Sequence, residues 1–146
     1  MPRAKNMNVD VVVSKAKNAK GVSFALKTGK KRAAHRVRFE NDRHPGVMVY
    51  FNIKDPNRTG LEFKQEPSQA LWVNSQGTEC PTNACHWDQF VPLSVEKNIA
   101  GKYKQLIVYC RNEQIKEFAF TLWFLKPDGT AVDYDPIGDG NNGLRL

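Results

Sequence analysis

The segment EFAFTLWFL, residues 117–125, constrains the fold of this chain more than any other stretch. Successive side chains of a β-strand point to opposite faces of the sheet. One face of this segment would carry Phe118, Phe120, Leu122 and Phe124, and the other Ala119, Thr121, Trp123 and Leu125. A strand that is apolar on both faces belongs in the interior of a sheet. We therefore expect residues 117–125 to form a central strand.

The same period of two recurs along most of the chain. It is clear at 22–26, 35–40, 47–53 and 103–110, and shorter candidates are 9–13, 61–64, 71–74, 90–95 and 131–134. Turn signals such as KDPNRTG separate these segments, and the PDG of KPDGT predicts a tight hairpin. No segment keeps a helical period of 3.6, so at most a short helical turn is expected, near 94–100.

These patterns predict an all-β fold with little or no helix. Many short strands at this spacing favour an antiparallel β-sandwich of immunoglobulin-like or Greek-key type, with a barrel as the alternative. A length of 146 residues fits one domain. We expect a flexible N-terminus at 1–8, a single sandwich domain at 9–134 and an irregular C-terminal tail at 135–146.

Composition bears on location and partners. No apolar run is long enough for a membrane span, and the basic start lacks the apolar core of a secretory signal. We therefore expect a cytoplasmic protein with no membrane partner. Three cysteines are an odd number, which fits free thiols in a reducing compartment. Cys110 alternates with core residues, whereas Cys80 and Cys85 are close enough in sequence to pair or to bind metal.

The charge is distributed unevenly. Residues 1–46 hold 12 Lys/Arg and 3 Asp/Glu, a net +9, whereas residues 47–146 carry a net −2. The basic region 27–43 includes Lys30, Lys31, Arg32, Arg36 and Arg38. Such a patch predicts contacts to the phosphates of a nucleic acid or another polyanion. Exposed aromatic side chains would also be needed for stacking on single-stranded bases, and Tyr50 and Trp72 are the candidates. The structural alternative is a solvated basic face.

Catalytic motifs are not found in the sequence. The segment GVSFALKTGKK departs from the phosphate-binding loop in spacing, and no G-x-S-x-G is present. Cys85 and His86 are adjacent, but neighbours on a strand face opposite sides, which argues against a thiol nucleophile and its base. Cys80, Cys85, His86 and Cys110 could supply a zinc site, although their spacing is loose. We expect no enzyme and no cofactor.

The acidic tail DYDPIGDGNNG is the second metal candidate. Read as a calcium loop from Asp133, it places Asp135 and Gly138 correctly, but Leu144 stands where the template needs a bidentate glutamate. A site built from Asp133, Asp135 and Asp139 would therefore need a ligand from another loop. The alternative is a strand that ends at Tyr134, followed by Pro136 and glycines.

Two dipeptides carry a resemblance. They are Asp55-Pro56 in IKDPNRTG and Glu66-Pro67 in FKQEPSQALW. Together with the all-β pattern and the closing DYDPIGDGNNG, they resemble the small bacterial DP-EP family, which is named for such dipeptides. The resemblance covers most of the chain and implies a sandwich-like domain of unknown function, with no catalytic residues. Asp55 and Glu66 would converge if residues 51–64 formed a hairpin.

The sequence thus predicts a non-enzymatic β-sandwich that acts as a binding or interaction module with an unidentified ligand. The alternative is nucleic-acid or polyanion binding through residues 27–43. The partner would be a protein or a polyanion, and exposed edge strands would allow a homodimer.

Overall fold

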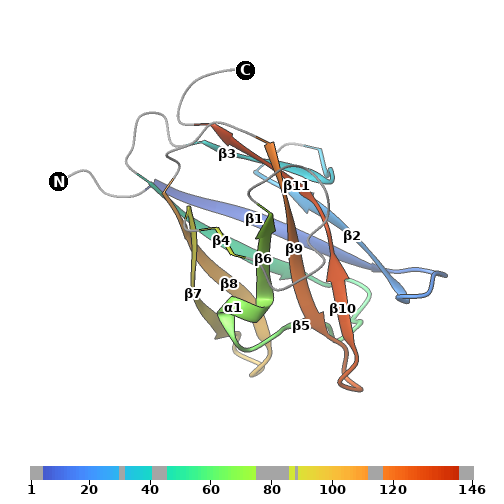
Figure 1. Cartoon of the computed structure of the whole chain (residues 1–146). Helices are drawn as coiled ribbons and strands as arrows, with labels where there is room; N and C mark the ends of the chain where they lie inside the picture. Colours follow the sequence, from blue (N-terminus) through green and yellow to red (C-terminus); the bar gives the residue numbers. More distant parts are fainter. Residues whose placement is uncertain are drawn as a thin grey trace.

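The computed structural model describes residues 5–29, 32–40, 46–74, 86–87, 89–111 and 117–141. Within these ranges the chain forms strands joined mostly by short turns, and one short helix (Figure 1). In chain order the elements are β1 (Lys5–Lys15), β2 (Val22–Lys27), β3 (Arg36–Glu40), β4 (Val47–Lys54), β5 (Glu62–Phe63), α1 (Pro67–Ala70), β6 (Leu71–Asn74), β7 (Phe90–Lys97), β8 (Tyr103–Cys110), β9 (Glu117–Leu125), β10 (Ala131–Tyr134) and β11 (Ile137–Asn141).

The strands form two sheets that share one apolar core. One sheet has the order β2-β1-β4-β8-β7, and the other has the order β10-β9-β11-β3, with β5 and β6 also paired to β9. Aromatic rings join the sheets: Phe24 of β2 stacks on Phe124 of β9 with ring centroids 5.0 Å apart, and Phe51 of β4 lies 6.0 Å from Phe120 of β9. The all-β prediction is confirmed.

The expected antiparallel pairing needs a correction. β1 pairs with β4 in parallel, and β11 pairs with β3 in parallel, so both sheets are mixed. The chain leaves β1 through the hairpin to β2, crosses to the other sheet as β3 and returns as β4. Such a long crossover is what a parallel pair requires. Alternation reports only which face is buried, and therefore cannot distinguish parallel from antiparallel neighbours. The immunoglobulin-like or Greek-key subtype stays a prediction.

Strands extend beyond the predicted bounds of the sandwich domain, 9–134. β1 begins at Lys5, inside the segment expected to be flexible, and β11 occupies residues 137–141 of the expected irregular tail. β11 has the sequence IGDGN, which lacks an apolar alternation. Its strand conformation follows from pairing with β9 on one side and β3 on the other.

The helical turn expected near 94–100 is not formed. That segment is the end of β7 and a hairpin turn, in which Asn98 N donates to Lys102 O. The helix is α1, which begins at Pro67, because proline fits the first turn of a helix, where its missing N–H is not needed. α1 has four residues, and no helix among the described ranges is long and apolar enough to cross a membrane.

β9 is the central strand that the sequence predicts. It pairs with β5 and β6 along one edge and with β10 and β11 along the other. Its inner residues Phe118, Phe120, Leu122 and Phe124 are buried, and Ala119 and Thr121 on the outer face are buried as well. Cys110 is fully buried in the core, as the alternation predicts, and its sulfur is not part of a disulfide.

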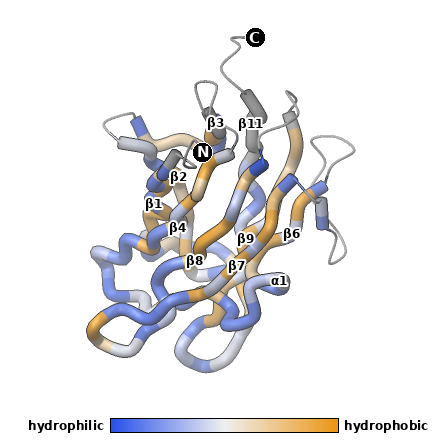
Figure 2. Tube along the Cα trace, turned by 90° about the vertical axis from the view of Figure 1, so that its left-hand side faces the viewer, coloured by the Kyte–Doolittle hydropathy of each residue, from blue (hydrophilic) through white to orange (hydrophobic). Residues whose placement is uncertain are grey.

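Three connections between strands lie close together and line one pocket. They are the β1–β2 hairpin, the loop from Asp55 to Leu61, and the β9–β10 turn (Figure 1). The hydropathy tube shows that hydrophobic residues gather along the strands, whereas the loops at the lower end of the view are mostly hydrophilic (Figure 2). The candidate functional site is built from these three connections.

Candidate functional site

A pocket of about 360 Å³ opens where the three connections meet. Its cationic lining comes from Lys15, Lys20 and Lys126, and the rest of its lining is Ala16, Gly21, Val22, Thr59, Leu61 and Pro127. We call this site the lysine pocket. Of the described residues that line it, none is a carboxylate, a histidine or a cysteine. Its chemistry is therefore that of ammonium groups beside an apolar surface.

One wall of the lysine pocket is held in place by Asp55. The carboxylate accepts hydrogen bonds from Thr59 N at 2.9 Å, from Thr59 Oγ1 at 3.0 Å and from Gly60 N at 2.9 Å. Lys104 of β8 adds an ion pair at 3.6 Å, and its ammonium also donates to Leu61 O. Asp55 thus holds the loop in a closed conformation and attaches it to β8, the strand next to β4.

These donors decide the ionisation of Asp55. Burial alone would raise its pKa, since it penalises the charged form. The hydrogen bonds from Thr59 and Gly60, together with the nearby Lys104, outweigh burial and hold the pKa of Asp55 below its usual value. The carboxylate is therefore ionised and committed to structure.

The same loop packs closely against the β9–β10 turn. Gly60 has a φ of 78°, a left-handed conformation that favours glycine. A Cβ atom at this position would lie 2.7 Å from Pro127 Cγ, which is closer than real contacts allow. Asn57 Oδ1 also accepts a hydrogen bond from Lys15 N at 2.9 Å, which ties the loop to the end of β1. The absence of a side chain at Gly60 brings two walls of the pocket together.

The three pocket lysines differ in their partners. Lys20 Nζ donates to Asp133 O at 2.7 Å and lies 3.1 Å from Asp133 Oδ1, so its position is fixed by β10. Within the described ranges, the ammonium groups of Lys15 and Lys126 form no ion pair. Lys126 Nζ lies near Gly21 across the pocket. Two cationic groups are thus left for an anion.

Two aspartates lie behind Lys20. Thr121 Oγ1 of β9 donates to Asp135 Oδ1, and the Asp135 carboxyl group lies close to that of Asp133. Burial is the main cause that raises the pKa of Asp135, and the neighbouring negative charge of Asp133 raises it further. Lys20 and the Thr121 hydroxyl act in the opposite direction. Asp135 therefore holds its proton more readily than an ordinary aspartate does.

A second pocket, of about 470 Å³, lies on the other side of Asp55. It is lined by Asn52, Ile53, Lys54, Asp55, Glu96, Lys97, Asn98, Lys104 and Gln105. Its charges are of both signs, and several of its polar groups already bond one another: Lys104 pairs with Asp55, and Gln105 Nε2 donates to Asn52 Oδ1 at 2.8 Å. This internal satisfaction leaves the lysine pocket as the better candidate for a ligand site.

The predicted metal residues are partly brought together. The carboxyl groups of Asp133 and Asp135 lie close together, but the side chain of Asp139 lies outside the described residues, although its backbone belongs to β11. Among the described side chains, no group of three His, Cys, Asp or Glu could hold a metal ion. The calcium hypothesis for the tail stays a prediction.

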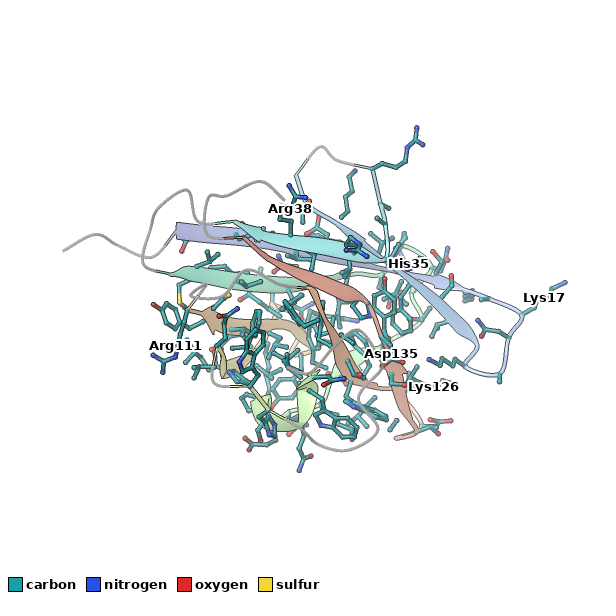
Figure 3. The ribbon with its side chains drawn as sticks, turned by 45° about the horizontal axis from the view of Figure 1, so that its top comes forward. Lys17, His35, Arg38, Arg111, Lys126 and Asp135 are labelled. Carbon is teal, nitrogen blue, oxygen red and sulfur yellow. The ribbon has the colours of Figure 1, made fainter. Side chains whose placement is uncertain are left out.

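The described residues of the predicted polyanion patch do not line the lysine pocket. Lys30 and Lys31 fall outside the described residues, and Arg32 is exposed. Arg36 and Arg38 belong to β3 and already interact with other groups of the chain. Arg38 lies apart from Lys126, and Lys17 extends from the tip of the β1–β2 hairpin (Figure 3). The lysine pocket is therefore a different site from the predicted 27–43 patch.

The sulfur and histidine candidates contribute little to a site. Cys80 and Cys85 lie outside the described residues, so their pairing or metal binding stays a prediction. His86 is exposed, and its Nε2 lies 2.8 Å from Ser68 O, whereas Cys110 is buried in the core. His35 Nδ1 lies 2.8 Å from the hydroxyl of Tyr134, whose pKa is raised by burial.

The aromatic candidates are only partly exposed. Tyr50 and Trp72 are both half-buried, and Trp72 packs at 4.9 Å against Trp123 on the outer face of the sheet. The indole N–H groups of this pair are buried and without a partner. Lys64 lies over the Trp123 ring at 4.7 Å. The tryptophan pair is therefore closed in by its own surroundings and offers no open stacking platform.

The acidic residues before proline have structural contacts. Asp55 binds the loop that follows β4, and Glu66 O accepts the amides of Gln69 and Ala70 at the start of α1. The Glu66 carboxylate contacts Ser68 Oγ at 3.4 Å. Asp55 and Glu66 share no hydrogen-bond partner among these contacts, so their convergence stays a prediction.

The pocket lysines were not predicted from the sequence. Lys15 and Lys20 flank the turn SKAKNAKG, and Lys126 begins the turn KPDGT, so each lies at the end of a predicted strand. Only the strand order shows that these two turns meet at the same end of the molecule. A search for clustered lysines in turns would have found the first pair, but not its partner.

A scan of protein-family models finds no match to this chain, and a search of curated proteins finds none either. The resemblance to the DP-EP family stays a prediction.

Proposed function

We propose that the chain is a non-catalytic binding module, and that its ligand is a small anion carrying an apolar group. The observation that carries this proposal is the lysine pocket, in which Lys15, Lys20 and Lys126 surround an otherwise largely apolar lining. Its volume of about 360 Å³ falls within the range of small-molecule sites.

The lining selects the chemistry of the ligand. Ammonium groups bind carboxylate or phosphate oxygens through charge-assisted hydrogen bonds. Ala16 and Pro127 offer apolar contacts to whatever is attached to that charged group, whereas Val22 and Leu61 of the lining are buried. A bare ion would use only the first of these features, and a neutral apolar molecule only the second. A compound with both, such as an alkyl carboxylate or an alkyl phosphate, uses the whole pocket.

The electrostatics support an anion over a cation. Lys15 and Lys126 form no ion pair with described residues, whereas the carboxylate of Asp133 is engaged by Lys20. The Thr59 hydroxyl donates to Asp55, so it does not serve as a free nucleophile. With no carboxylate, histidine or cysteine among the described lining residues, binding is better supported than catalysis. Polyanion binding through residues 27–43 stays the alternative prediction.

The test is calorimetric titration with hexanoate and hexyl phosphate, with acetate, inorganic phosphate and hexanol as comparison compounds. We expect both hexyl anions to bind more tightly than any comparison compound. Lys126→Gln should weaken hexyl phosphate binding about tenfold, since it removes one charge-assisted hydrogen bond. Lys17→Gln is the matched control, because Lys17 is exposed at the hairpin tip outside the pocket lining. Failure of both hexyl anions to bind, or equal losses in the two variants, would overturn the proposal.

A further inference from the structure

The outer face of the β1-β4-β8-β7 sheet carries a continuous uncharged surface. It comprises Asn8 of β1, Met48 and Tyr50 of β4, Val91 of β7, and Ile107 and Tyr109 of β8. The strand register places Tyr50 between Asn8 and Ile107, and Tyr109 between Met48 and Val91. We call these six residues the uncharged face. Asn8 is exposed and the other five are half-buried.

Side-chain contacts hold several residues of the uncharged face in place. Gly46 precedes β4, and a Cβ atom there would lie 2.2 Å from the Tyr109 hydroxyl, so the Tyr109 ring lies across a position that has no side chain. Below Tyr50, Asn52 Nδ2 donates to Asn8 Oδ1 at 3.2 Å and Gln105 Nε2 donates to Asn52 Oδ1 at 2.8 Å. This ladder fixes the amide side chains of three strands. Ordering before association lowers the entropy lost on binding.

The composition of the face is that of a protein interface. Tyrosine and methionine are enriched in the centres of interfaces, and charged residues are depleted there. A quarter of the whole chain is charged, yet none of the six residues is. Charged residues lie towards both ends of the sheet: Asp10, Lys54 and Glu96 supply both signs at one end, and exposed Arg111, two residues after Tyr109, lies at the other.

The charge of the chain indicates which partner fits. A net charge of +7 makes two copies repel each other, and a two-fold contact sets each residue patch against the same patch of the other copy. A basic surface in such a contact would meet its own charge, which is costly. The uncharged face meets itself without this cost, and a rim with both signs can be self-complementary. We infer that the uncharged face is the interface of a homodimer, and this inference is independent of the lysine pocket.

Sedimentation velocity over a wide range of protein concentration tests the homodimer. The wild-type chain should shift from monomer to dimer as concentration rises. Ile107→Lys places a charge at the centre of the face on both copies and should raise the dimer dissociation constant at least about tenfold. Ile99→Lys is the matched control, because Ile99 is fully exposed in the β7–β8 turn, and it should dimerise like the wild type.

A second variant tests the same face in case Ile107→Lys fails to fold. Asn8→Lys changes an exposed residue of the same face, and it should weaken dimerisation while leaving the folded spectrum unchanged. A wild-type chain that stays monomeric at every concentration would overturn the inference. Dimers that persist unchanged in a folded Asn8→Lys variant would place the contact elsewhere and would also overturn it.

Discussion

Two Asp-Pro dipeptides act on residues of the lysine pocket from opposite electrostatic conditions. Asp55 is surrounded by hydrogen-bond donors and a lysine, and its pKa is lowered. Asp135 is partly buried beside a second carboxyl group, Asp133, and its pKa is raised. In both regions the proline follows the end of a strand, so the covalent motif is the same. The surroundings, and not the dipeptide, decide what each carboxyl group does.

The difference separates a structural carboxylate from a responsive one. Asp55 fixes the loop that supplies Thr59 and Leu61 to the pocket. Asp135 stands behind Asp133, which fixes Lys20, and the charge of Asp135 is therefore felt at the pocket. Perturbed carboxyl groups of this kind are often found at functional sites. Substitutions at and beside the two carboxyl groups test this difference.

The largest effect is expected for Asp55→Ala. It removes the acceptor of three hydrogen bonds and the partner of Lys104, and the Asp55 side chain is only 10% exposed. We expect a loss of about 2–4 kcal/mol in the free energy of unfolding, measured by urea denaturation. A loss below about 0.5 kcal/mol, the usual scale of a surface substitution, would show that Asp55 does not hold the loop.

The next effect tests the contact between the Asp55 loop and the β9–β10 turn. Gly60→Ala should cost about 1–3 kcal/mol, because it adds a clash with Pro127 to the strain of a positive φ. Gly101→Ala is the control, since Gly101 has a φ of 79° and a Cβ atom there would meet no other atom within 4 Å. The difference between the two losses in the free energy of unfolding measures the close packing of Gly60 against Pro127. Equal losses would show that this packing contributes nothing.

A smaller effect of opposite sign is expected for Asp135→Asn. Asn Oδ1 can still accept from Thr121, while the repulsion with Asp133 disappears, so stability at neutral pH should rise by about 0.5–1 kcal/mol. Asp135 favours folding below its ordinary pKa of 3.8, and this contribution is lost as pH rises through its raised folded pKa. The gain of the variant should therefore vanish in acid. Destabilisation of the variant at neutral pH would contradict the repulsion between Asp133 and Asp135.

The pH dependence of Asp55 runs the other way. Its lowered pKa contributes stability above 3.8, which is lost as pH falls through the folded value. The loss in the free energy of unfolding caused by Asp55→Ala should thus be largest at neutral pH and become smaller in acid. Denaturation of both variants at several pH values separates the two carboxyl groups, and parallel curves would mean that their environments do not differ.

The smallest effect concerns the ligand. Asp135→Asn removes a negative charge behind Lys20, so hexanoate should bind about two- to threefold more tightly, and added salt should reduce the difference. Calorimetric titration of the wild type and the variant with hexanoate measures this difference in affinity. Unchanged affinity at low salt would show that the acidic pair is electrically isolated from the pocket.

The strands were predictable because burial of one face leaves a period of two in the sequence. β4 shows this most clearly, since its residues alternate between buried and more exposed positions. β11 was not predictable, because its IGDGN sequence is held in strand conformation by neighbours far away in the chain. The parallel pairs were not predictable, because the alternation of apolar residues does not depend on the direction of the neighbouring strand.

The candidate site was less predictable than the fold. Asp55 was singled out as a strand-ending residue, but its partner Lys104 is 49 positions away and its role depends on that contact. Lys126 and Lys20 come from hairpins at opposite ends of the sequence. The basic patch at 27–43 drew attention because its charges are close together in sequence, whereas the pocket lysines are brought together only by folding.

The most direct test of the lysine pocket is a two-dimensional amide NMR titration with hexyl phosphate. We predict saturable shifts of the Gly21, Thr59 and Leu61 amides, which line the pocket, while the amides of Arg36 and Arg38 in β3 stay unmoved. Shifts confined to β3, or no saturable shift at the pocket amides, would contradict the proposal that this end of the molecule binds an anion.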